Sequence, residues 1–151
     1  MVLIQPAAPV IACSRPWRWF AGAAGGVLAA VLPYLVGVLL PYHVNGLHRL
    51  PLDGVASGRY DPELLWPSYT GCGGWVDLLG VFGLATAPMG LLAGAVVGVL
   101  VAGRAVLVAR SRLRAAPGVV PAFTALAVAC AAGLWWFLGD TSAALATWRM
   151  D

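Results

Sequence analysis

Side chains able to bind a metal ion are concentrated between residues 41 and 77. They comprise two histidines, one cysteine and four carboxylates: His43, His48, Cys72, Asp53, Asp61, Glu63 and Asp77. Imidazole, thiolate and carboxylate groups are the ligands that zinc and other transition metals use in proteins. Their spacing here matches no recognised pattern, and spacing is what makes such an assignment specific. A metal- or haem-binding redox component that uses His43, His48 and Cys72 is therefore the third of three hypotheses for function, and we expect no cofactor.

Glycines surround Cys72 in the sequence SYTGCGGWVD, residues 68–77. A glycine-rich loop between two membrane spans can form an ion filter, but a filter requires a supporting helix before it. Pro67 interrupts any such helix, so the sequence favours a turn, with Asp77 capping the helix that follows. Cys72 and the two histidines also lack the surrounding motif of a nucleophilic site. We expect the chain to have no enzymatic activity of its own.

Three charge-free runs account for most of the remaining chain. They cover residues 19–40, 78–102 and 118–138, with lengths of 22, 25 and 21 residues. Hydrophobic residues make up 61% of the 151-residue chain and charged residues 10%, whereas soluble domains are about 25% charged. A helix crosses a bilayer with about 20 apolar residues. The sequence thus predicts an all-α integral membrane protein in which these three runs are transmembrane helices.

The nine basic residues, all arginines, are distributed unevenly around the predicted helices. Segment 1–18 contains two of them, Arg15 and Arg18, and the connection 103–117 contains four. The connection 41–77 contains two and the tail 139–151 contains one. Because arginine-rich segments remain in the cytoplasm, we predict an N-in, C-out topology in which the 37-residue connection 41–77 and the tail lie outside.

The four arginines of the second connection are Arg104, Arg110, Arg112 and Arg114. Their position beside a predicted helix end places them near anionic lipid headgroups, each contributing about 1 kcal/mol of attraction. The cluster is short and has no interleaved aromatic residues, so it does not predict nucleic-acid binding.

The connection 41–77 contains one signal for the start of a helix. Asp61 is a suitable cap, Pro62 suits the first helical position, and Glu63 places an acid in the first turn. Since Pro67 follows closely, we expect a helix of one or two turns.

Small residues recur every four positions along the second predicted span. They are Thr86, Gly90, Gly94, Gly98 and Ala102. Small side chains on one face allow membrane helices to approach closely, where van der Waals contact holds them together. The sequence therefore predicts that this face is a helix-packing contact.

The three predicted spans contain no Asp, Glu, Lys, Arg or His between their ends. Ionisable groups within a membrane usually mark ion or proton pathways, so their absence opposes a coupled transporter. The leading hypothesis is a small non-catalytic membrane protein that acts through helix packing, either as a homo-oligomer or as an accessory subunit of a larger membrane complex. The alternative is a channel or transporter protomer. A basic content made of arginine alone, with 19 glycines, suggests a high-GC bacterium and hence a multi-pass protein of the bacterial plasma membrane.

Overall fold

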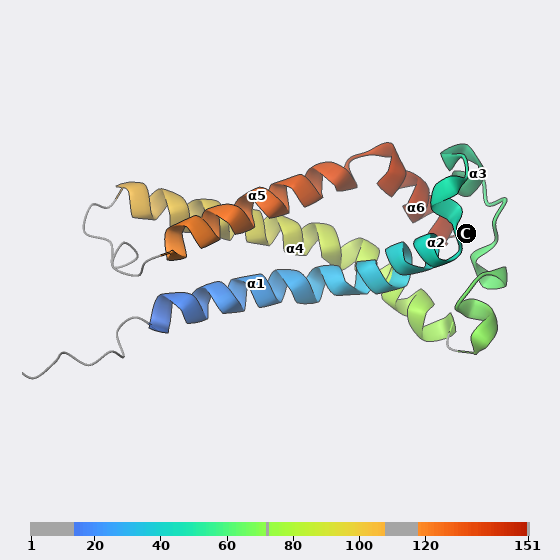
Figure 1. Ribbon diagram of the computed structural model, residues 1–151, viewed down its shortest axis with the longest axis horizontal. Helices are drawn as coiled ribbons and strands as arrows, with labels where there is room; N and C mark the ends of the chain where they lie inside the picture. Colours follow the sequence, from blue (N-terminus) through green and yellow to red (C-terminus); the bar gives the residue numbers. More distant parts are fainter. Residues whose placement is uncertain (1–13, 72, 108–117, 151) are drawn as a thin grey trace, which may run out of the picture.

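The computed structural model describes residues 14–71, 73–107 and 118–150, and all regular elements within these residues are helical. Three helical stretches are long and apolar enough to cross a membrane: Arg15–Val44, Gly73–Arg104 and Val119–Phe137. The predicted helical class and the number of candidate spans are thereby confirmed. Figure 1 shows these stretches as an elongated bundle, with the short helices gathered at one end.

The elements follow one another in a simple order. The first stretch comprises α1 (Ser14–Tyr34), the π-helix η2 (Leu35–Leu39) and α2 (Leu40–Val44). Short helices then lead to the second stretch: η3 (Leu47–Arg49), α3 (Leu52–Ala56), η4 (Pro62–Leu64) and η5 (Ser68–Thr70). The remaining helices are α4 (Gly73–Leu107), α5 (Val119–Phe137) and α6 (Asp140–Met150).

Two of the long helices extend beyond the charge-free runs that predict them. The first continues through α2 to Val44, and α4 begins at Gly73, so the connection between them covers residues 45–72. Asp77 consequently lies inside α4, and the expectation that it caps this helix is wrong. A carboxylate near a helix N-terminus is stabilised by the helix dipole, so the charge at Asp77 does not have to end the helix.

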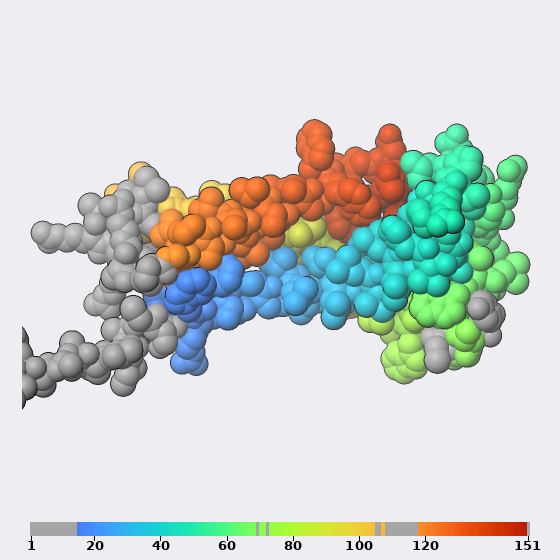
Figure 2. All heavy atoms as spheres, viewed as in Figure 1, coloured from blue at the N-terminus to red at the C-terminus, as the bar shows by residue number. Residues whose placement is uncertain are grey.

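Helix α4 is the centre of the bundle. It packs extensively against both α1 and α5, whereas α1 and α5 contact each other much less. In Figure 2, α5 and α1 cover much of the middle of the viewed face, and α4 shows between them and again below α1 beside the cap. At the end where α1 begins, the rings of Phe20 and Phe123 pack edge to face with centroids 5.3 Å apart. This aromatic contact joins α1 to α5 directly.

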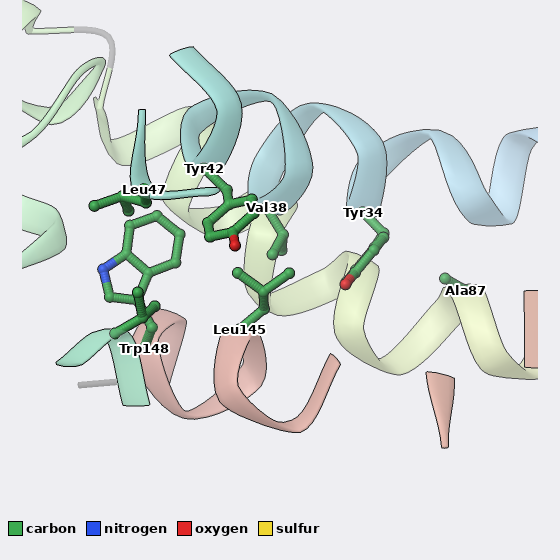
Figure 3. Close-up of a cluster of buried hydrophobic side chains, with 8 residues drawn as sticks. Tyr34, Val38, Tyr42, Leu47, Ala87, Leu145 and Trp148 are labelled. Atoms are coloured by element: carbon green, nitrogen blue, oxygen red, sulfur yellow. The ribbon is translucent and has the colours of Figure 1, made fainter. Parts of the chain in front are cut away.

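The short helices and α6 form a compact layer at the other end of the bundle, which we call the cap (residues 40–71 and α6). Its core joins side chains from α1, η2, α2, η3, α3, α4 and α6: Tyr34, Val38, Tyr42, Leu47, Val55, Ala87, Leu145 and Trp148. Figure 3 shows Leu145 and Trp148 pointing from α6 toward Val38, Tyr42 and Leu47. The predicted tail 139–151 therefore contains a packed helix.

The helix start predicted at Asp61 is present. The Asp61 side chain accepts a hydrogen bond of 2.8 Å from the Glu63 backbone N–H, and Pro62 occupies the first position of η4. The helix ends after a single turn of 3₁₀ type, because Leu65 adopts an extended conformation.

Candidate functional site

The two histidines of the predicted metal site lie side by side on the surface of the cap. Their rings are stacked, with centroids 5.2 Å apart and planes 21° apart, and both residues are exposed. His43 Nδ1 lies 2.9 Å from the Leu39 carbonyl oxygen, one turn earlier in the helix. The Tyr42 ring is arranged edge to face with both imidazoles, with centroids 5.2 Å from that of His43 and 6.4 Å from that of His48.

This stacked arrangement does not form a metal site as it stands. The lone pairs of an imidazole lie in the plane of its ring, so two nearly parallel, stacked rings direct them within two separate planes and not toward a common point between the rings. Within residues 14–71, 73–107 and 118–150, no three His, Cys, Asp or Glu residues are grouped closely enough to hold a metal ion. Cys72 lies outside the described residues. Among the described residues, His43 and His48 thus lie together without a third ligand.

The predicted helix-packing face of α4 lies against the chain's own helices. A β-carbon built on Gly90 would be 2.3 Å from Ala30 Cβ, and one on Gly98 would be 2.7 Å from Ala127 Cβ. At Gly94 the same test gives 2.5 Å to Val27 Cγ2 and 2.7 Å to Cys130 Sγ. The glycines therefore allow α1 and α5 to approach α4 from its two sides.

The polar member of this face forms a hydrogen bond between helices. Thr86 Oγ1 donates to the Ala30 carbonyl oxygen over 2.9 Å, which ties α4 to α1. Ala102, at the other end of the face, is half-buried. Because the predicted face is occupied within one chain, it is not a free surface for a second protein.

The predicted headgroup arginines are described in part. Arg104 is exposed in the last turn of α4, at the end of the bundle opposite the cap. Arg110, Arg112 and Arg114 lie outside the described residues.

Where the first helical stretch crosses α4 beside the cap, its backbone forms a π-helix. Pro41 has no N–H to donate to the Gly37 carbonyl, and its ring would clash with that carbonyl in a regular α-helix. The wider turn Leu35–Leu39 accommodates both effects. A β-carbon on Gly37 would lie 2.2 Å from the Gly80 nitrogen, so the two backbones are in direct contact. The sequence contains the signals for this feature, Gly37 and Pro41, four residues apart. A span that is predicted from the absence of charge alone does not take them into account.

An arginine from α6 is buried beside this crossing. Arg149 forms an ion pair with Asp77, and its side chain is 3% exposed, whereas that of Asp77 is 46% exposed. A β-carbon on Gly80 would lie 2.6 Å from Arg149 Nε and 2.9 Å from the Gly37 carbonyl oxygen. The arginine can occupy this position because residue 80 is a glycine. Burial of a charged group is stabilising only when it is paired, so Asp77 determines whether Arg149 can stay buried.

The neighbouring residue, Trp148, is buried in the core of the cap. It is fully enclosed, and its Nε1–H donates to the Tyr60 carbonyl oxygen over 2.7 Å. Asn45 fixes the connection in a second place: its Nδ2 donates to the carbonyl oxygens of Trp66 and Pro41, and its Oδ1 accepts from the Trp66 N–H. The polar groups of Trp148 and Asn45 thus form hydrogen bonds that stabilise the cap.

Comparisons with protein-family models, with curated proteins and with solved structures find no match.

Proposed function

We propose that this chain is a multi-pass protein of the bacterial plasma membrane that has no catalytic activity of its own and acts through helix packing as a homo-oligomer. Exposed tryptophans occur near both ends of the bundle, at Trp17 and Trp19 on one side and at Trp75 and Trp135 on the other. Tryptophan favours the headgroup level of a bilayer, where its ring and its N–H are both satisfied. This distribution supports a membrane position with the bundle across the bilayer.

The observation that carries the oligomer proposal is the outward face of α5. Seven of its residues line an open, nearly flat apolar surface, which we call the groove: Val120, Pro121, Thr124, Ala125, Val128, Ala129 and Ala132. The hydroxyl of Thr124 already donates to the Val120 carbonyl oxygen over 3.0 Å, so the groove requires no polar partner. Small side chains on a lipid-facing surface allow another helix to pack closely. This face replaces the small-residue face of α4 as the proposed contact.

We assign the occupant of the groove as α5 of a second copy of this chain. An isologous contact places one face against itself, and the small apolar side chains of this face allow two copies of it to pack closely. A matched pair of variants tests the assignment: Ala132→Leu in the groove, and Ala93→Leu on the exposed surface of α4. The wild-type chain in lipid nanodiscs should be a dimer by single-molecule subunit counting. Ala132→Leu should raise the dissociation constant about tenfold, the equivalent of about 1.4 kcal/mol.

Ala93→Leu should leave the dissociation constant unchanged. A wild-type chain that is monomeric and purifies from native membranes without a partner would overturn the proposal. A monomer that co-purifies with another membrane protein would also overturn the homo-oligomer and would favour an accessory subunit of a larger membrane complex instead. If Ala93→Leu weakened the dimer and Ala132→Leu did not, the contact between the two copies would not lie on α5.

We further propose that the cap lies outside the cytoplasm. Arg15 and Arg18 at the start of α1 and Arg104 at the end of α4 lie opposite the cap in the bundle (Figure 1). Positively charged flanks favour the cytoplasmic side. In a chain with its native cysteines replaced by serine, Ser57→Cys should react with a membrane-impermeant maleimide in intact cells. Arg104→Cys should react only after lysis, and the reverse pattern would contradict the orientation.

A further inference from the structure

We propose that α6 is a latch that holds the cap closed, and that the cap can open while the three long helices stay packed. The inference starts from two adjacent residues at the end of α6. Trp148 enters the core of the cap, and Arg149 reaches α4 at Asp77 and Gly80. Neighbouring residues on a helix point about 100° apart, so one turn of α6 contacts the cap and the bundle at once.

The connection 45–72 depends on Trp148 for its core. Its longest helix, α3, has five residues, and helices of this length are unstable alone because nucleation is unfavourable. Val55 on α3 and Leu47 on η3 are fully buried, and both belong to the cluster that includes Trp148. The bond from Trp148 Nε1 to Tyr60 adds the polar contact that fixes the connection to α6. Removal of the Trp148 side chain would leave Leu47 and Val55 without the large apolar group of their core.

The contact that joins the latch to the bundle is held by charge. Arg149 Nε has no hydrogen-bond partner among the described residues, so Asp77 is the anchor of this buried guanidinium. The guanidinium carbon also lies 5.9 Å from the centre of the Trp148 ring, which couples the two contacts. A buried charge that loses its partner favours an open, hydrated state. As long as residue 149 is an arginine, the closed latch therefore depends on the Asp77 side chain as its partner.

The part of the bundle away from the cap is packed without this latch. Its contacts at Gly90, Gly94 and Gly98 involve side chains of α1 and α5 and none of α6. Phe20 and Phe123 join α1 and α5 at the end farthest from the cap. Opening of α6 would expose the core of the cap and leave these contacts in place.

Limited trypsin digestion of the whole chain in lipid nanodiscs tests the latch. Arg59 is exposed beside Tyr60, the acceptor for Trp148, so cleavage after Arg59 reports opening of the cap. Trp148→Ala and Asp77→Asn should each accelerate this cleavage about tenfold or more, since each removes one of the two contacts. Asp53→Asn, which neutralises an exposed carboxylate of the cap, is the matched control and should change the rate by less than about twofold.

A double variant separates a latch from a folding defect. In Asp77→Leu with Arg149→Met, an apolar pair replaces the ion pair, and cleavage after Arg59 should return to within about threefold of the wild-type rate. The helical circular dichroism should stay at its wild-type level in every variant. Unchanged cleavage in Trp148→Ala and Asp77→Asn would overturn the latch, and so would a loss of helicity that accompanies cleavage. Both readouts are intramolecular, so they are unaffected by whether the chain forms dimers.

Discussion

Gly37 in the π-helix and Gly80 in α4 face each other with their backbones in contact: a β-carbon on Gly37 would lie 2.2 Å from the Gly80 nitrogen. Gly37→Ala should therefore push the two helices apart and lower the free energy of unfolding by about 1–3 kcal/mol. Gly25→Ala is the control, because a β-carbon there meets no atom within 4 Å. It should be neutral or slightly stabilising, since alanine is the better helix former. Unfolding in mixed detergent micelles measures both, and equal effects would contradict the contact.

The glycine contact of α4 with both flanking helices gives a second prediction. At Gly94 even a methyl group would overlap Val27 and Cys130, so Gly94→Ala should destabilise the chain by about 1–3 kcal/mol, and Gly94→Leu by more. The loss should appear in the unfolding of single chains. A Gly94→Leu chain that unfolds normally but fails to associate would show that this face of α4 contacts a second chain and not α1 and α5 of the same chain.

The hydroxyl of Thr86 gives a prediction for one hydrogen bond between membrane helices. Thr86→Val removes the bond to Ala30 and should cost about 0.6 kcal/mol, with about 1.7 kcal/mol as the upper limit for such bonds. Thr124→Val is the matched control, because its hydroxyl bonds only to Val120 in its own helix. The free energy of unfolding should therefore be lower for Thr86→Val than for Thr124→Val. A larger loss for Thr124→Val would be the contrary result.

Asn45 gives a prediction that is confined to the cap. Asn45→Ala leaves the N–H and the carbonyl of Trp66 without their partners, which should cost about 2 kcal/mol locally. Hydrogen exchange at the Trp66 amide should accelerate by about tenfold or more, while exchange in the middle of α4 stays unchanged. Ser57→Ala removes only an exposed hydroxyl bonded to Gly54 and should change the Trp66 rate by less than about twofold.

Much of the bundle could be predicted from the sequence because it depends on local properties. The charge-free runs locate the three long helices, since a membrane span is defined by length and apolarity. The triplet Asp61, Pro62 and Glu63 predicts η4 because capping acts within one turn. The four-residue period of α4 indicates a packing face, although it does not indicate which helices fill that face.

The cap could not be predicted in the same way because its contacts join distant parts of the chain. Trp148 and Tyr60 are 88 residues apart, and Arg149 and Asp77 are 72 residues apart. A span that is predicted from a charge-free run has to begin after Asp77. In the structure Asp77 lies within α4, where it forms an ion pair with Arg149 of α6. Helix α6 shows no marked apolar stripe, and its two anchors, Trp148 and Arg149, occupy a single turn. Pairings of this kind become visible only in three dimensions.

The distance between Tyr60 and Trp148 along the chain has a consequence for biosynthesis. At translation rates of about 5–20 residues per second, the 88 residues that separate them take about 4–18 s to synthesise. During that interval the first two long helices can enter the membrane, while Val55 and Leu47 remain without the side chain that covers them. We therefore expect the cap to be the last part of the protein to fold, and a ribosome stalled before residue 148 to carry an inserted bundle with an uncovered connection.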